Sequence, residues 1–96
     1  MNVIFGQQNA SLLDKRYLIL ELEKFHGVDC FCAISYDQIP NEEMPQLAYI
    51  VKLHRSLVHN LREENYAVCQ ELVSHLMGKF GGELDTFYQE VLRRSS

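Results

Sequence analysis

The stretch MPQLAYIVKLHRSLVHNL, residues 44–61, decides the fold of this chain. Its apolar residues recur every three or four positions, which places them on one stripe of a helix about five turns long. These positions are Met44, Leu47, Ile50, Val51, Leu57, Val58 and Leu61. Because such a stripe needs a large apolar partner, we expect the core to be assembled on this helix.

The composition indicates one small globular domain that spans residues 1–96. Hydrophobic residues make up 47% of the chain and charged residues 23%, which is the ordinary globular range. The formal net charge of -4 gives no general attraction for phosphate backbones, so nucleic acid is not a favoured partner. A chain of 96 residues buries a limited core and gains stability from association, so we expect a homodimer.

The N-terminal sequence and the cysteines bear on location. The N-terminus has neither a basic segment nor a long apolar run, so we expect no signal peptide and no membrane span. Three cysteines are an odd number and do not suggest an extracellular disulfide framework. We therefore expect a cytoplasmic protein.

A β-hairpin is predicted at residues 16–36. Along its first half, side chains alternate with a period of two, which is typical of a half-buried strand. Residues 28–36 form a second strand. His26-Gly27 between them fits a two-residue turn, because glycine adopts the positive φ that such turns need. The run NVIF at residues 2–5 is also β-prone, so we expect an antiparallel sheet of two or three strands.

The predicted turn sets Phe25 opposite Val28 and thereby fixes the register of the hairpin. One face then carries Leu18, Leu20 and Leu22 and is covered by helices. The other face is mixed, and its members are Tyr17, Ile19, Glu21, Glu23, Ile34 and Tyr36, together with Cys30 and Cys32. A solvated face would be more polar, so we expect this face to contact a twin subunit or a partner protein.

Three helices complete the predicted fold, at about residues 42–63, 66–78 and 83–94. Each carries one apolar stripe, and a short join or a Gly-Gly pair separates it from the next. The sequence therefore predicts an α+β domain, in which a short antiparallel sheet is covered on one face by three helices.

Asparagine and serine residues mark the expected starts of helices. Asn41 is the predicted cap of the main helix. Nearer the N-terminus, Asn9 or Ser11 is expected to cap a single turn that carries Leu12 and Leu13 inward.

His54 and Cys69 are the candidate buried polar residues. His54 lies in the middle of the apolar stripe, so we expect a neutral imidazole in the core or at an interface, with both nitrogens satisfied. A thiol and imidazole pair that meets across the helix hairpin is the enzymatic alternative. It lacks a recognisable nucleophile turn or oxyanion loop, so we expect no enzyme and no catalytic residue.

The cysteines and acids of the hairpin offer a second chemical alternative. Cys30 and Cys32 share a strand face and could bind a soft metal ion together with Glu21 or Glu23. Known zinc sites use wider thiol spacings and a second pair, so we expect no metal and no cofactor. The two glutamates are better explained as charges that discourage aggregation of the sheet than as an acid and base pair.

A basic row on the main helix is the candidate anion contact. Lys52, Arg55, His59 and Arg62 lie three or four residues apart, away from the apolar stripe. A solvated helix face is the simpler explanation, because no aromatic residue interrupts the row and the chain is acidic. A small nucleic-acid-associated regulator that uses this row is the alternative function.

The order of the segments NVIFG, KRYLILELEKF, EMPQL and GGELDTFYQEVL resembles that of small proteins from marine phages related to the T-even group. The resemblance covers most of the chain and includes no motif of known role. It implies a cytoplasmic protein of an infected bacterium that binds host or phage machinery, and it transfers no catalytic residue. With the features above, it favours a non-enzymatic interaction module that self-associates.

Overall fold

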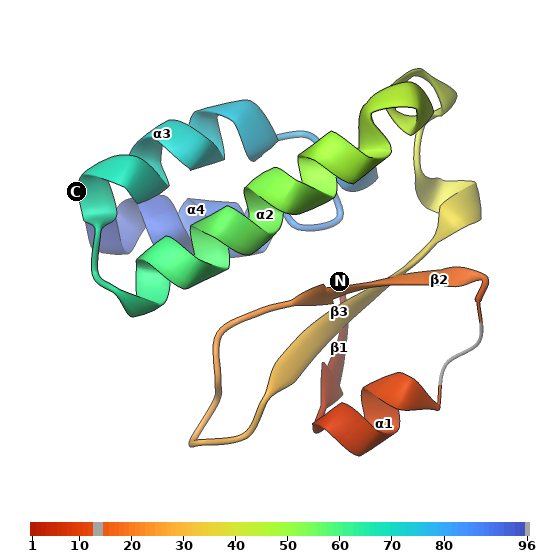
Figure 1. Ribbon diagram of the computed structural model, residues 1–96, viewed down its shortest axis with the longest axis horizontal. Coiled ribbons are helices and arrows are strands. Elements are labelled where there is room, and N and C mark those ends of the chain that lie inside the picture. Colours follow the sequence, from red (N-terminus) through yellow and green to blue (C-terminus); the bar gives the residue numbers. More distant parts are fainter. Residues whose placement is uncertain (13–14, 96) are drawn as a thin grey trace.

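The computed structural model describes residues 1–12 and 15–95. Within them the chain forms an α+β fold, in which helices α2, α3 and α4 lie together over one side of a three-stranded antiparallel sheet (Figure 1). The short helix α1 lies on the other side of the sheet (Figure 1). The molecule measures 35 × 33 × 18 Å, and the helices and the sheet lie apart in the plane of Figure 1, so its shortest dimension runs along the two layers and not through them.

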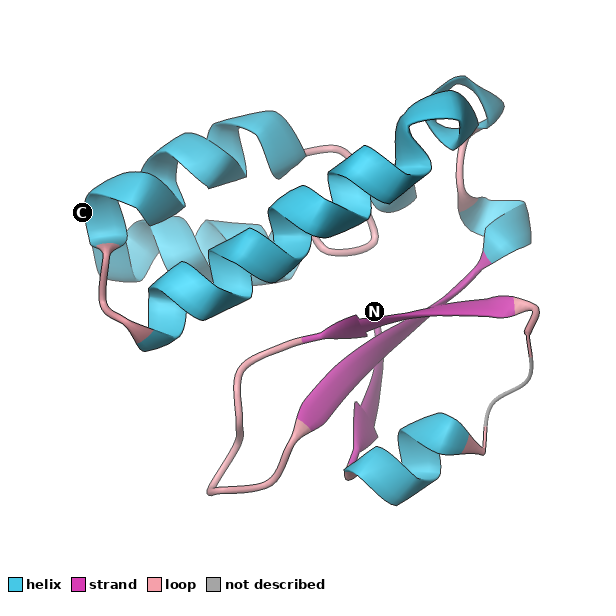
Figure 2. Cartoon of the chain, viewed as in Figure 1, coloured by secondary structure: helices cyan, strands magenta, loops and turns pink. Residues whose placement is uncertain are grey.

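The sequence predicts an antiparallel sheet of two or three strands, and the structure has three. Strand β1 spans Asn2–Phe5, β2 spans Tyr17–Glu21 and β3 spans Cys30–Ser35, in the order β1-β3-β2 (Figure 2). The hairpin turn is also confirmed, because His26 and Gly27 both have positive φ, at 51° and 79°.

The predicted register of the hairpin is wrong by one residue. Phe25 pairs with Val28 as expected, but further along Leu20 pairs with Cys32 instead of Ala33. The cause is a β-bulge in the first strand of the hairpin. Between the Phe25–Val28 pair and the hydrogen bond from Leu22 N to Cys30 O, the first strand has two residues, Glu23 and Lys24, whereas the second strand has only Asp29.

Because side chains alternate, this one-residue shift turns the second strand over. Cys30, Cys32 and Ile34 therefore face the helices and are buried. Phe31 and Ala33 occupy the opposite face instead.

The core between the sheet and the helices is built on the main helix. Helix α2 spans Leu47–Arg62, α3 spans Tyr66–Leu76 and α4 spans Asp85–Ser95. The apolar stripe of α2 is confirmed from Ile50 onward. Its buried members are Ile50, Val51, Leu57, Val58 and Leu61.

The first turn of the predicted main helix is a separate 3₁₀ helix, Asn41–Gln46. Pro45 disfavours the α conformation at the residue before it, which accounts for this tighter segment. Met44 is consequently exposed, although the stripe predicted it to be buried. The cap predicted at Asn41 is also wrong, because neither helix start carries a side-chain cap hydrogen bond.

The connection between α3 and α4 is fixed by side chains from distant segments. Glu43 Oε1 accepts a hydrogen bond from Phe80 N at 2.7 Å, and Asp85 Oδ1 accepts one from Gly78 N at 2.8 Å. Gly81 has a φ of 65°, and a Cβ there would lie 2.6 Å from the carbonyl oxygen of Gln38. Only glycine permits this close approach.

The second face of the sheet is not the open surface that the sequence predicts. Helix α1, Gln7–Ser11, lies on that side, and Phe31 and Ala33 are buried there. Of the predicted surface residues, Ile34 is fully buried against the helices. Leu12 is exposed, which contradicts its expected inward position, and Leu13 lies outside the described residues.

Candidate functional site

His54 links three elements inside the core. Its Nδ1 lies 2.9 Å from the hydroxyl of Tyr88 on α4, and its Nε2 lies 2.6 Å from the backbone carbonyl of Glu21 on β2. Both nitrogens of this fully buried ring are therefore satisfied, as the sequence predicts for a structural histidine. The sequence missed Tyr88 as the partner, because 34 residues separate it from His54.

The proton positions in this network follow from the carbonyl group. A carbonyl only accepts, so Nε2 of His54 donates to Glu21 and Nδ1 accepts from the Tyr88 hydroxyl. Burial lowers the pKa of His54 and raises that of Tyr88, so the imidazole and the phenol are both neutral. These groups hold β2, α2 and α4 together.

The hairpin acids pair with arginines from the helices. The carboxylate of Glu21 accepts a hydrogen bond from Arg62 at the end of α2. Glu23 accepts two from Arg94 of α4, at 2.9 and 2.6 Å. The two glutamates thus fasten the hairpin to the helical layer, and Arg94 is a partner that the sequence did not reveal.

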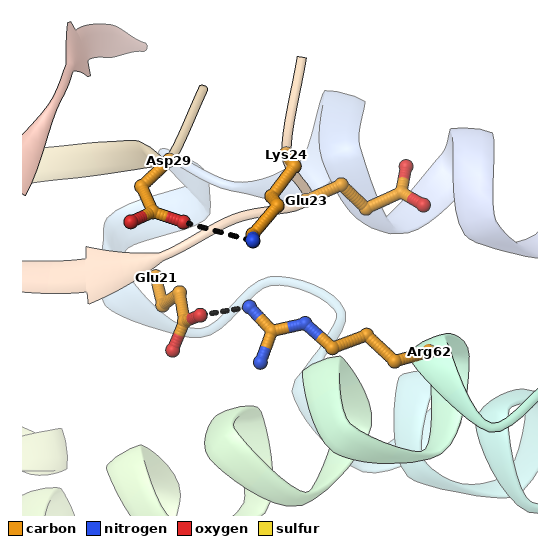
Figure 3. Close-up of a pocket in the computed structure, with 5 residues that line it drawn as sticks. All are labelled: Glu21, Glu23, Lys24, Asp29 and Arg62. Atoms are coloured by element: carbon orange, nitrogen blue, oxygen red, sulfur yellow. Dashed lines mark hydrogen bonds and ion pairs between the residues drawn. The ribbon is translucent and has the colours of Figure 1, made fainter. Parts of the chain in front are cut away.

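A charged cleft of about 620 Å³ opens at this corner of the molecule. Figure 3 shows its lining, with the Glu21 and Arg62 pair facing Lys24 and Asp29, which lie 3.9 Å apart. Three acids and two bases line the cleft, and the third acid, Glu23, pairs with Arg94 outside the lining, so each of these carboxylates has a basic partner.

An apolar groove of about 240 Å³ continues from the cleft, and Glu23 and Lys24 line both hollows. Val3, Phe5 and Phe25 line one side of the groove and Phe87 of α4 also borders it. The rings of Phe5 and Phe25 are 6.1 Å apart. The groove exists because helices α2–α4 do not cover β1 fully.

The groove belongs to a larger exposed apolar area, which we name the Phe5–Phe25 surface and define as Val3, Phe5, Phe25 and Val28. Each of these side chains is between 42% and 58% exposed. Small soluble domains seldom expose several large apolar side chains together unless something binds there. Sequence reasoning missed this surface because β1 and the hairpin tip meet only in the folded chain.

A comparison with protein-family models, curated proteins and solved structures finds no match for this chain. Its site is therefore assigned from geometry alone.

The predicted basic row is only partly available for anions. Arg62 is paired with Glu21, which removes it from the row. Lys52, Arg55 and His59 are exposed on α2, and no ion pair involves them among the described residues. Three exposed polar side chains without aromatic neighbours in the row are typical of a solvated helix face.

The side chains of the three cysteines are buried. Burial raises the pKa of Cys32 to about 11 and also raises the pKa of Cys69. All three cysteines are free. Within the described residues no group of three or more His, Cys, Asp or Glu side chains is placed to hold a metal ion. No helix in the described part of the chain has the length and apolar character needed to cross a membrane.

Proposed function

We propose that this chain is a non-enzymatic protein-interaction module that forms a homodimer through the Phe5–Phe25 surface. The observation that carries the proposal is the exposure of four large apolar side chains beside an edge strand. Burying them against a second copy removes this apolar area from water and favours association.

The outer edge of β1 supports a second copy as the partner. Gly6 N donates to Asp29 O, so the alternation of an antiparallel ladder directs the backbone groups of Val3 and Phe5 outward. Asn9 Nδ2 already donates to the Phe5 carbonyl at 2.7 Å. The remaining outward groups fit a short antiparallel contact with the same strand of a twofold-related chain.

The charges beside the surface also fit a second copy. Lys24 and Asp29 lie next to Phe25, are well exposed and are 3.9 Å apart. A surface that carries both signs is complementary to itself, since a twofold axis allows Lys24 of one chain to face Asp29 of the other. We propose the cytoplasm as its location, which fits three free cysteines.

Light scattering across a dilution series tests the homodimer. The wild-type chain is expected at twice its 11.2 kDa mass, and Phe25→Ser is expected to shift the equilibrium towards monomer by at least tenfold in Kd. Tyr49→Ser removes an equally exposed aromatic ring on α2 and is the matched control.

A wild-type monomer at every concentration would overturn the proposed dimer. So would a dimer that survives both Phe25→Ser and Phe5→Ser, provided that circular dichroism shows both variants to be folded.

A further inference from the structure

A third hollow, of about 360 Å³, lies between the start of α2 and the end of α3, and we call it the α2–α3 pocket. Apolar side chains from both helices line it, namely Ile50, Leu53 and Met77. Polar groups that complete the lining include Tyr49, His75 and Lys79. Its volume lies in the range of small-molecule sites, and its lining is more polar than that of most such sites, which favours a polar ligand.

The charge of the α2–α3 pocket is opposite to that of the whole chain. No carboxylate lines it, although the chain has a net charge of -4. Lys79 has no ion pair among residues 1–12 and 15–95. The ammonium group of Lys79 therefore lacks a counterion at the rim of the hollow.

Tyr49 supplies an aromatic face at the same rim. Its side chain is 62% exposed although it lines the pocket. Lys79 complements the carbonyl end of α3, which accounts for a cation there but not for an exposed ring beside a hollow. A ligand that contacts both the Tyr49 ring and Lys79 needs a planar aromatic ring to stack on Tyr49 and an anionic group to pair with the ammonium of Lys79.

We propose that the α2–α3 pocket binds a small molecule with a carboxylate or phosphate on a flat aromatic body. The ring stacks on Tyr49 over the apolar lining, and the anion contacts Lys79 and His75. This site is separate from the Phe5–Phe25 surface, so it does not depend on the proposed homodimer.

NMR titration of the full chain tests the site with three probes: AMP, phenylacetate and adenosine. We expect shifts at Tyr49, His75 and Lys79 with at least one anionic probe, and binding of adenosine at least tenfold weaker than that of AMP. A response to AMP alone identifies a phosphate ligand, whereas a response to phenylacetate identifies a carboxylate ligand.

Two variants and a control sharpen the test. Lys79→Gln is expected to weaken anionic binding by about tenfold, and Tyr49→Ala by a similar factor. Lys24→Gln, which removes an exposed cation from the distant charged cleft, is the matched control and should bind as the wild type does. The proposal is overturned if neither anionic probe shifts these signals, if adenosine binds as tightly as AMP, or if Lys79→Gln leaves the affinity unchanged.

Discussion

His54 is a buried histidine whose two ring nitrogens bond to different elements of the fold. The Tyr88 hydroxyl donates to Nδ1, and Nε2 donates to the Glu21 carbonyl, so the link to Tyr88 requires the neutral ring. This arrangement explains how a polar residue lies within the apolar stripe of α2 without a cost in unsatisfied hydrogen bonds.

Tyr88→Phe is expected to lower the free energy of unfolding by about 1–3 kcal/mol, because it leaves Nδ1 of His54 buried without a donor. Urea denaturation measures the difference. Tyr49→Phe removes a hydroxyl from an exposed ring and should change stability by less than about 0.5 kcal/mol. Equal losses in the two variants would contradict the role of the buried network.

Acid should destabilise the fold through His54. Burial lowers its pKa below 6.5, so the unfolded chain binds more protons at mildly acidic pH. Its contribution is complete above pH 6.5 and is lost as the pH falls towards the folded pKa. Protonation of His54 changes the free energy of unfolding by at most about 1.4 kcal/mol per pH unit.

Urea denaturation midpoints measured between pH 7 and pH 5 test this dependence, because histidine titrates in about this pH range. A folded His54→Gln variant should have a flatter profile than the wild type, whereas substitution of the exposed His59 should leave the profile unchanged. A His54→Gln profile as steep as that of the wild type would exclude His54 as the source.

At the scale of elements, the spacing of apolar residues along the sequence predicted the strands, the helices and their layers. The apolar spacing of α2 and the turn at His26-Gly27 are local signals, and both are confirmed. The predicted register of the hairpin was wrong because the extra residue of the bulge near Glu23 and Lys24 has no recognisable signal in the local sequence.

The candidate site was less predictable than the elements. Burial of His54 follows from its place in the stripe, but Tyr88 and Arg94 come from a helix that only the tertiary fold brings near. The Phe5–Phe25 surface likewise joins two segments that are distant in the sequence. Pair contacts of this kind depend on packing and not on periodicity.

The Glu23 and Arg94 pair should hold the hairpin to α4. Arg94→Gln is expected to cost about 0.2–1 kcal/mol, a small loss because both side chains are roughly one-third exposed. Hydrogen exchange should become faster at the hairpin tip, residues 23–29, while Arg55→Gln on the exposed flank of α2 leaves the exchange unchanged. Unaltered exchange in Arg94→Gln would show that the pair does not restrain the tip.

In the whole molecule, helices α2, α3 and α4 lie together on one side of the sheet and the short α1 lies on the other, which leaves β1 at a poorly covered edge. This shape places the Phe5–Phe25 surface and the α2–α3 pocket on different parts of the molecule. Substitutions at one site should therefore leave binding at the other unchanged.

The bond between His54 and the Glu21 carbonyl also bears on polymerisation. Glu21 lies at the end of β2, the second edge of the sheet, and its outward carbonyl is already occupied by the imidazole. Arg62 covers the side chain of the same residue. A further chain thus finds only a short run of β2 to pair with, so we expect the proposed assembly through β1 to close at two subunits and not to continue into a filament.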